Sequence, residues 1–412
     1  LPSLIVCPAS LVLNWAEECQ KFTPELSCVV VDGDAAHRAE LAESWPAADL
    51  VVTSYDLLRR DEALYEGQEF YACILDEAQA IKNHTTQKYK AVCKVRSRVR
   101  FALTGTPVEN RLGELWSIFS FLMPGYLPPY KSFCSRFEKP IVQEEDQTAV
   151  RRLNQLTGPF ILRRMKADVL KELPPKTENV YRIELEEEQR KLYLAAVVDA
   201  REKLQAAKPE DKMAVFAVLM RLREICCDPR LIADNWEGGS AKLDACAELV
   251  SSAVEGGHRI LLFSQFTSML ELLAKRLDAE GISHFTLQGS TPKPVRAELV
   301  RRFNGGEVSV FLISLRAGGT GLNLTAADIV IHYDPWWNVA AQNQATDRAY
   351  RIGQQNPVQV YKLIAQDTIE EKIVELQQAK QSLADTVTGT ADGAILSMRP
   401  DELLQLLEGS EP

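Results

Sequence analysis

The stretch Tyr71–Gln79, which reads YACILDEAQ, decides the fold class. Its first five residues are a short, mostly apolar run that is typical of a buried strand, and this run ends directly in Asp76 and Glu77. An open parallel α/β sheet binds its ligands at the carboxyl ends of its strands. An aspartate there can hold the Mg²⁺ of a nucleotide through water, and a glutamate can activate the attacking water. For an isolated Asp-Glu pair the alternative is a helix start, where the helix dipole favours acids.

Similar β-rich runs alternate with helical patterns along the chain, which predicts parallel sheets with crossover helices. The runs form two sets separated by a long interruption, so we expect two α/β lobes. The first set is Leu4–Cys7, Leu50–Val52, Cys73–Leu75 and Phe101–Leu103, and the second is Ile260–Phe263, Phe285–Leu287, Val310–Ile313, Ile329–Ile331 and Val358–Leu363.

The segment between these sets predicts a mostly helical insertion and linker, with helical patterns over Leu112–Leu122, Glu187–Gln205 and Met213–Cys226. Gly238-Gly239-Ser240 is the expected hinge before the second lobe. Residues 401–407 predict a short tail helix whose apolar side chains dock on that lobe. The expected domains are 1–165 (first lobe, with a helical protrusion at 111–150), 166–240 (insertion and linker), 241–385 (second lobe) and 386–412 (tail).

Composition excludes several classes of protein. The 412 residues are 46% hydrophobic and 25% charged, as in ordinary globular proteins, which excludes disordered and low-complexity classes. No apolar run reaches the roughly 18 to 20 residues of a membrane span. The formal charge of −10 argues against wholesale non-specific nucleic-acid binding but permits a local basic groove. Nine scattered cysteines without a C-x-x-C pair predict reduced, mostly buried thiols in an intracellular protein, with no structural zinc.

Three further motifs carry chemistry. The small-residue turn Thr104–Pro107 and the glycine-rich Arg316–Asn323 can bring backbone groups close to phosphates. In Gln344–Gln354, Arg348 and Arg351 are three residues apart, which predicts one helix face and a pair of guanidinium groups for a transferring phosphoryl group. Each motif alone is better explained as an ordinary turn or a solvated helix face. Their joint order is far more specific.

Taken in order, these blocks resemble the SWI/SNF-type ATPases of helicase superfamily two, from about Leu4 to Lys372. The most specific blocks are PFILRRMKADVLKELPPKTE and SLRAGGTGLN followed by ATDRAYRIGQ. The resemblance implies two RecA-like lobes that close on ATP and track along duplex DNA without unwinding it. The Ala-rich composition favours a bacterial member.

The resemblance also implies roles for individual residues. Asp76 and Glu77 would serve Mg²⁺ and water activation, Arg348 and Arg351 would be arginine fingers positioned by Gln344, and Thr104 and Thr106 would couple the lobes. Gly319 and Gly321 would lie at the junction of ATP and DNA. The expected DNA contacts are Ser10, Thr53, Ser54, Arg163, Arg164, Arg316, Asn323 and Trp337. Ser10 can also cap the helix after the first strand, and of Trp336 and Trp337 we expect one to pack in the core.

The chain departs from the family pattern in two places. The phosphate-binding loop G-x-x-x-x-G-K-[ST] should precede Leu4, yet none of the 21 glycines is followed by lysine. Because the chain begins at Leu1 without a basic leader, we expect a piece of a longer motor, truncated before the loop and without hydrolysis of its own. The second departure is Gln79, where many relatives have His, and we expect it to be tolerated.

Two basic segments are candidates for tracking DNA phosphates. Residues 151–176 carry seven basic residues against two acids, and residues 88–100 carry six basic residues and no acid. For the second segment a solvated helix face is the favoured interpretation.

The sequence therefore predicts an ATP-dependent double-stranded DNA translocase that uses ATP and Mg²⁺. The alternatives are an ATP-independent nucleic-acid-binding scaffold and a helicase-like motor acting on RNA or transcription complexes. The expected partners are double-stranded DNA and DNA-bound proteins or a polymerase as client, with no membrane partner, and the expected state is a monomer. A bacterial protein would act in the cytoplasm at the nucleoid, and a eukaryotic one in the nucleus.

Overall fold

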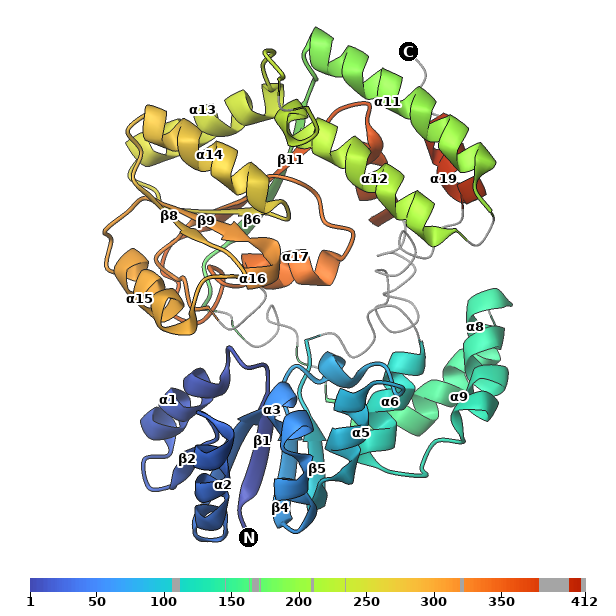
Figure 1. The fold of residues 1–412 in the computed structure, drawn as a ribbon, viewed down its shortest axis with the longest axis vertical. Coiled ribbons are helices and arrows are strands. Elements are labelled where there is room, and N and C mark those ends of the chain that lie inside the picture. Colours follow the sequence, from blue (N-terminus) through green and yellow to red (C-terminus); the bar gives the residue numbers. More distant parts are fainter. Residues whose placement is uncertain are drawn as a thin grey trace. The chain divides into compact units, whose positions relative to one another are not determined.

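The structure is a computed structural model that describes residues 1–105, 112–144, 146–162, 164, 170, 172–208, 211–233, 235–318, 322–377 and 400–408. The chain divides into two compact units (Figure 1). Unit 1 holds the described residues up to Arg164, and unit 2 holds those from Leu170 onward. Within these ranges, every helix is too short or too polar to cross a bilayer.

Unit 1 is built on a five-stranded parallel sheet with the strand order β2-β3-β1-β4-β5. The strands are β1 (Ser3–Cys7), β2 (Cys28–Val30), β3 (Leu50–Ser54), β4 (Glu69–Leu75) and β5 (Arg96–Ala102). Four of them match the predicted runs. The fifth, β2, was not predicted, because a strand of three residues is too short to show a readable period. In the central strand β1, Val6 is in register with both Thr53 of β3 and Leu75 of β4. The carboxyl ends of these three strands therefore lie side by side.

Helices cover both faces of this sheet. Helix α1 packs on Ile5, Cys7 and Val52, whereas α3, α5 and α6 pack on the other face against residues such as Val6 and Leu75. The helices are α1 (Val12–Phe22), α2 (Ala35–Ser44), α3 (Tyr55–Arg60), α4 (Glu62–Glu66), α5 (Gln87–Lys94), α6 (Leu112–Leu122), α7 (Tyr130–Phe133), α8 (Lys139–Gln143) and α9 (Gln147–Thr157), with the short turns η1 (Trp45–Ala47), η2 (Ala78–Ile81), η3 (Cys134–Glu138) and η4 (Gly158–Phe160).

The basic segment 88–100 is not one helix face, so that interpretation is wrong. Helix α5 ends at Lys94, and Arg96 begins β5, the edge strand of the sheet. Basic residues on an edge strand hinder pairing with another chain, and this masked the strand pattern. Much of the charge is also used locally, since Lys94 pairs with Glu62 and Arg100 donates to two backbone carbonyls.

Unit 2 contains a six-stranded parallel sheet with the order β6-β11-β10-β7-β9-β8. The strands are β6 (Lys176–Ile183), β7 (Ile260–Ser264), β8 (His284–Leu287), β9 (Val310–Ser314), β10 (Ile329–His332) and β11 (Val358–Ala365). Five match the predicted runs. Strand β6 lies in the segment predicted to be helical, and it pairs with β11 along its whole length. It is an edge strand with mostly exposed polar residues, so the sequence carries almost no apolar signal for it.

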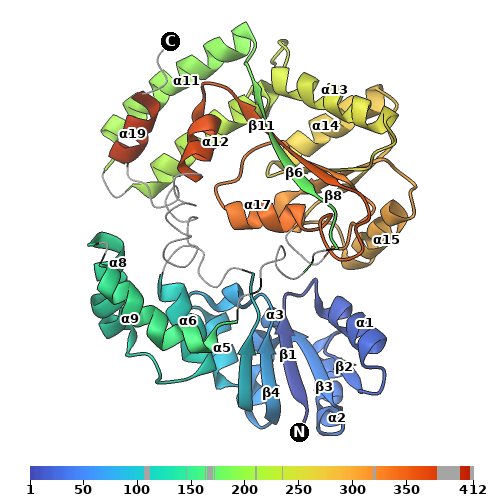
Figure 2. The same cartoon turned by 180° about the vertical axis from the view of Figure 1, so that it is seen from behind.

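Helices α13 and α14 cover one face of this sheet and α15 to α17 the other, while α11, α12 and α19 form a separate helical cluster (Figure 2). The bounds are α11 (Glu187–Ala206), α12 (Lys212–Cys227), α13 (Ala241–Glu255), α14 (Thr267–Ala279), α15 (Lys293–Asn304), α16 (Leu315–Gly318), α17 (Val339–Thr346), α19 (Pro400–Glu408) and the turn η5 (Pro229–Leu231). The predicted tail helix is α19, whose Leu403 and Leu407 are buried against α11 and α12.

The expected hinge at 238–240 lies inside unit 2, because the chain divides after Arg164. A Cβ atom at Gly239 would come within 2.5 Å of the Glu186 carboxylate. Three residues after Gly239, the fully buried Lys242 forms an ion pair with the fully buried Glu370, with 2.5 Å between Nζ and Oε2. This segment is therefore anchored in the unit and is not a hinge.

Candidate functional site

The candidate site of unit 1 begins where β4 ends. The backbone N–H of Asp76 donates to the carbonyl of Val6 at 2.9 Å, which continues the sheet by one residue. The next residue, Glu77, has a φ of 50°, in the left-handed region that costs a residue with a side chain roughly 1 kcal/mol or more. This sharp turn leaves both carboxylates at the carboxyl end of the sheet.

The Asp76 carboxylate is held by two donors. Its Oδ2 accepts a hydrogen bond from the Trp15 indole Nε1 at 2.9 Å, and its Oδ1 accepts one from the Glu77 backbone N–H at 2.9 Å. The backbone carbonyl of Asp76 accepts a third bond, from the Tyr55 phenol, also at 2.9 Å. Neither Trp15 nor Tyr55 is among the residues predicted from the sequence.

A second set of bonds connects Glu77 to Thr104. The Gln79 amide donates from Nε2 to Glu77 Oε2 at 2.6 Å and accepts at Oε1 from the Thr104 hydroxyl at 2.8 Å. An amide suits this position because it donates and accepts at once. The structure thus brings together Asp76, Glu77 and Thr104. Thr106, predicted to act with Thr104, lies outside the described residues.

This arrangement fits a Mg²⁺ ion brought in with a nucleotide. No three His, Cys, Asp or Glu side chains of the described ranges gather to hold a metal ion on their own. Mg²⁺ usually keeps several waters and takes one or two carboxylates plus substrate phosphates, so two adjacent acids are enough. Each Asp76 oxygen accepts one of these hydrogen bonds and has a further lone pair that can accept from a metal-bound water.

The expected DNA contacts of unit 1 fall into two groups. Ser10 lies partly exposed in the turn after β1, but the helix cap is Leu11 without a side-chain bond, so the predicted cap by Ser10 is wrong. Thr53 is fully buried and accepts from the Tyr65 phenol at 3.0 Å, which leaves its hydroxyl no surface for a phosphate. Ser54 is also buried, and its hydroxyl caps α3. Arg164 is exposed, and Arg163 lies outside the described residues.

In unit 2, Arg348 and Arg351 do not share a helix face as predicted. Helix α17 ends at Thr346, and both arginines lie in the turns that follow. Arg348 is only 8% exposed, and its carbonyl accepts from the backbone of Leu324 at 3.0 Å.

The turn after these arginines is fixed by Gln354. Its buried amide donates to the carbonyls of Ala327 at 2.7 Å and Ala349 at 3.1 Å, and Gly353 supplies a φ of 102°. The Gln354 side chain at the end of this motif is therefore bonded to backbone carbonyls, which helps to hold the turn that bears the two arginines.

The remaining predicted residues of unit 2 are dispersed. Gln344 is partly exposed on α17, and Asn323 is exposed, with its carbonyl accepting from Asn304 at 2.8 Å. Trp337 is only 5% exposed and packs within the α11–α12 cluster, with its ring 6.1 Å from that of Phe216. Of the two tryptophans, Trp337 is therefore the one that packs in the core, and its predicted contact with DNA is not supported. Gly319 and Gly321 lie outside the described residues, as does the side chain of Arg316.

A buried ion pair ties the helical cluster to the sheet of unit 2. Arg223 of α12 lies 3.3 Å from Asp334, which follows β10, and both are at most 4% exposed. Asp334 also accepts from the Ser264 hydroxyl at 2.6 Å and the Gln265 backbone at 3.2 Å. Burial raises the pKa of Asp334, and the Arg223 charge opposes this rise. The Arg223 guanidinium lies 4.3 Å from the ring centre of Trp337.

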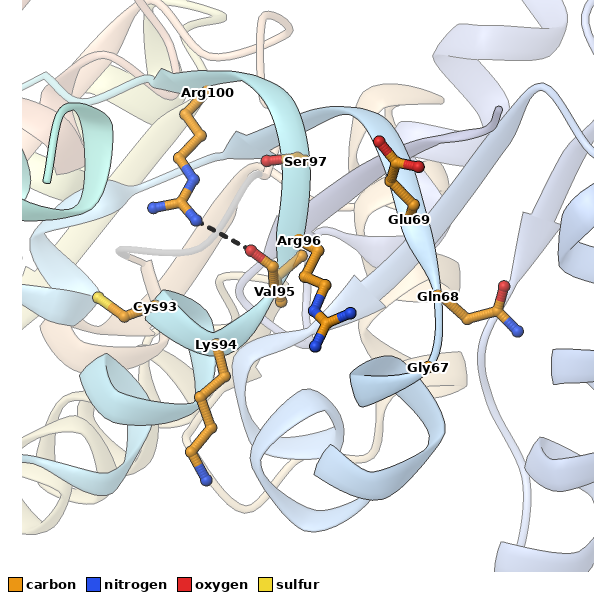
Figure 3. A pocket seen from close by; sticks show the side chains of 9 residues that line it. All are labelled: Gly67, Gln68, Glu69, Cys93, Lys94, Val95, Arg96, Ser97 and Arg100. Atoms are coloured by element: carbon orange, nitrogen blue, oxygen red, sulfur yellow. Dashed lines mark hydrogen bonds between the residues drawn. The ribbon is translucent and has the colours of Figure 1, made fainter.

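Unit 1 also has a pocket, which lies at the other end of the strands from Asp76 and Glu77 (Figure 3). It has a volume of about 420 Å³ and is lined at the amino ends of β4 and β5 by residues that include Glu69, Lys94 and Arg96. Arg100, also in its wall, is bonded to the carbonyl of Val95 at 2.9 Å. Since ligands of parallel sheets bind at the opposite edge, this pocket is not part of the candidate site.

Comparison with known proteins identifies two families of domains in the chain. Residues 2–231 match the SNF2-related domain, and residues 241–353 match the helicase conserved C-terminal domain. The SWI2/SNF2 ATPase core domain of Sulfolobus solfataricus is similar to the chain, with 35% identity, a TM-score of 0.50, and coverage of 99% of this chain and 84% of that one. The predicted fold of two RecA-like α/β lobes is thereby confirmed.

Several curated proteins are similar over nearly the whole chain. An uncharacterized ATP-dependent helicase of Mycoplasma pneumoniae is 40% identical, over 99% of this chain and 39% of its own length. The putative ATP-dependent helicase/translocase YwqA of Bacillus subtilis is 39% identical, over 98% of this chain and 45% of its own length. Human TATA-binding protein-associated factor 172 is 36% identical, over 98% and 26%. The chain spans about two fifths of the length of the two bacterial relatives.

Proposed function

The chain belongs to the SNF2-related family of ATP-dependent helicases, and on that premise we propose that it is part of a motor that couples ATP hydrolysis to movement on duplex DNA. The observation that carries this proposal is the pair of acids at the carboxyl end of β4, with Asp76 held by two donors and Glu77 bonded through Gln79 to Thr104.

In this proposal each acid has a separate role. Asp76 holds the Mg²⁺ of the nucleotide through water, and the metal ion, when bound, neutralises charge on the phosphates. Glu77 orients the attacking water and takes its proton. The Gln79 amide donates to one Glu77 oxygen at 2.6 Å, which limits the orientations that the carboxylate can adopt. Precise orientation of this kind supplies a large part of the rate in phosphoryl transfer.

Arg348 and Arg351 are proposed to stabilise the charge on the transferring phosphoryl group. Arginine fingers contribute roughly 10³ to 10⁵ in rate. The support is indirect: both lie on a turn that Gln354 anchors to buried backbone, and a fixed backbone limits the entropy lost when a long side chain engages its ligand. Gln344, one turn before Arg348, is proposed to position it.

We propose duplex DNA as the nucleic acid, contacted in unit 1 by the partly exposed turn that holds Ser10 and by the exposed Arg164. The relative YwqA is named a helicase/translocase, which agrees with movement along nucleic acid. The printed sequence lacks the G-x-x-x-x-G-K-[ST] pattern, so we propose that hydrolysis needs a phosphate-binding loop beyond this sequence. In a bacterial cell the motor would act at the nucleoid, and DNA-bound proteins are its proposed clients.

The test is ATP turnover by the full-length protein with blunt duplex DNA, with single-stranded RNA, and with neither. Duplex-specific stimulation is expected. The Glu77→Gln variant should lose turnover by 10³-fold or so while binding duplex DNA as before, because only the catalytic carboxylate is removed. Glu298→Gln is the matched control, since that glutamate lies exposed on α15. Stimulation by RNA alone would favour the motor on RNA, and no turnover at all would favour the ATP-independent scaffold.

A further inference from the structure

Two segments of unit 1 begin at the sheet edge where β4 ends. The register places Cys7 beside Ser54, and Val6 beside Leu75. The turn that follows β1 and the helix that follows β3 therefore begin at the same sheet edge as Asp76, both on the β1 side of β4. The first segment holds Ser10, a proposed DNA contact, whereas Thr53 and Ser54 at the start of the second are buried.

Each of these two segments sends one aromatic hydrogen-bond donor to Asp76. Trp15, in the first turn of α1, donates its indole N–H to the carboxylate at 2.9 Å. Tyr55, the first residue of α3, donates its hydroxyl to the backbone carbonyl at 2.9 Å. Tyr55 is only 3% exposed.

We propose that Trp15 and Tyr55 are positioning residues that set the orientation of Asp76, and that Trp15 connects it to the turn after β1 that is proposed to contact DNA. This inference rests on the proposed function, since it deepens the same site. The two bonds act on different parts of Asp76. Trp15 fixes the carboxylate that would face the metal-bound water, whereas Tyr55 fixes the backbone from which the side chain projects.

The connection to the loops is short. Trp15 follows the turn containing Ser10 by one helical turn, and its backbone N–H donates to the carbonyl of Leu11 at 2.9 Å. Tyr55 directly follows Ser54, whose hydroxyl caps α3. A shift of the turn that holds Ser10 on binding DNA is therefore transmitted to Asp76 through the Trp15 side chain. Hydrogen bonds weaken steeply with distance and angle, so a small shift is enough to change how Asp76 is held.

The competing explanation is that both aromatic residues only fill space. Trp15 does pack on the small apolar cluster beneath α1, and Tyr55 packs in the core on the other face of the sheet. Substitution by phenylalanine separates the two explanations, because it keeps a ring in the core and removes the donor.

The chain offers a matched control for each variant. Trp116→Phe also removes an indole donor, which bonds the carbonyl of Pro128 at 2.8 Å. Tyr126→Phe also removes a phenol that bonds a backbone carbonyl, that of Leu156, at 2.9 Å. Both control bonds lie in unit 1 and neither involves Asp76.

The experiment measures three quantities in the full-length protein for Trp15→Phe, Tyr55→Phe and the two controls. They are the Mg²⁺ concentration for half-maximal binding of a fluorescent ATP analogue, the affinity for duplex DNA by fluorescence anisotropy, and the stimulation of turnover by that DNA. Removing the group that orients a metal-holding carboxylate typically costs about 10- to 100-fold in metal affinity or activity.

We therefore expect Trp15→Phe to raise the required Mg²⁺ concentration roughly tenfold and to reduce stimulation by DNA, and Tyr55→Phe to raise the Mg²⁺ requirement by a smaller factor. DNA affinity should stay within twofold in both. Variants that match their controls in Mg²⁺ requirement and in stimulation would overturn the inference.

A wild-type protein without DNA-stimulated turnover would refute the proposed function, and the coupling to DNA would fall with it. The positioning of Asp76 would still be decided by the Mg²⁺ dependence of nucleotide binding. Trp15→Phe and Tyr55→Phe are measured separately, so each variant tests the positioning role of its own residue.

Discussion

Removing the charge of Arg223 should destabilise unit 2 strongly, because it leaves Asp334 buried without its cation. In the Arg223→Met variant the methionine fills most of the same volume. What is lost is the ion pair at 3.3 Å, the bond to the carbonyl of Pro335, and the contact with the Trp337 ring.

The magnitude follows from burial. Removing one partner of a buried ion pair typically costs about 3 to 5 kcal/mol, because the other charge is stranded. Asp334 retains two donors, from Ser264 and Gln265, so the lower end of that range applies, about 3 kcal/mol. Two nitrogens of Arg223, Nε and Nη1, have no hydrogen-bond partner among the described residues. These unsatisfied donors reduce the net free energy by which the wild-type ion pair stabilises the fold. The double variant Arg223→Met with Asp334→Asn should therefore lose only about 1 kcal/mol, since the amide oxygen still accepts from Ser264.

The stability that Arg223→Met loses relative to the wild type should increase as the pH rises. Burial already raises the pKa of Asp334 in the folded state, and removing Arg223 raises it further. When the pKa of a carboxyl group is higher in the folded state than in the unfolded state, protonation favours the folded state. This stabilisation is complete below the ordinary carboxyl pKa and is lost as the pH rises through the folded-state pKa. The gap between Arg223→Met and the wild type should therefore be smallest in acid and widen as the pH rises, and in the double variant this dependence should be absent.

The assay is hydrogen exchange as a function of urea, read on peptides from β7, β9 and β10, which assigns the transition to unit 2. The control is Arg301→Met, whose partner Glu298 is exposed and whose loss should cost under about 0.5 kcal/mol. If Arg223→Met is no less stable than this control, the reasoning is refuted. If the double variant is as unstable as the single one, the cost does not come from the stranded carboxylate.

Three further predictions concern other sites. Gln79→Ala should lower DNA-stimulated turnover about tenfold by releasing the Glu77 carboxylate, whereas Gln79→His should retain it, and steady-state kinetics measure both. Leu403→Ala should cost about 2 to 5 kcal/mol in the α11–α12–α19 cluster, because the side chain is fully buried, and urea-dependent exchange of α12 peptides measures the loss. Burial raises the pKa of the Cys226 thiol, and that of Cys246 to about 12, so iodoacetamide at pH 7 should label neither until urea unfolds unit 2, as read by mass spectrometry.

The central strands could be predicted from the sequence because buried parallel strands are continuous apolar runs, as in Val310–Ser314, every residue of which is buried. Three of the four edge strands could not: β2 and β6 were not predicted, and the predicted run Phe101–Leu103 overlaps only the end of β5, whereas the edge strand β8 was predicted. In β6 the exposed residues are mostly polar, and in β5 arginines alternate with partly exposed residues, so neither strand shows a pattern that distinguishes it from a loop or a helix face. The prediction of a helix that includes Arg348 and Arg351 was wrong for a related reason. Spacing of three residues fits a helix, but Gly353 and Gln354 bond the chain into turns that local periodicity does not encode.

The candidate site shows the same division between local and long-range information. Asp76 and Glu77 follow directly from one strand, so nine residues of sequence were enough to find them. Trp15 and Arg223 are 61 and 111 residues away from the carboxylates that they bond, and no local pattern ties one to the other. Their partners become known only when strand order places the ends of β1, β3 and β4 together, and when α12 packs against the end of β10. Both bonds hold a carboxylate, and in both the donor comes from a helix outside the strand that bears it. Such long-range donors determine how firmly a carboxylate is held. The Trp15→Phe and Arg223→Met variants therefore test interactions that sequence motifs do not reveal.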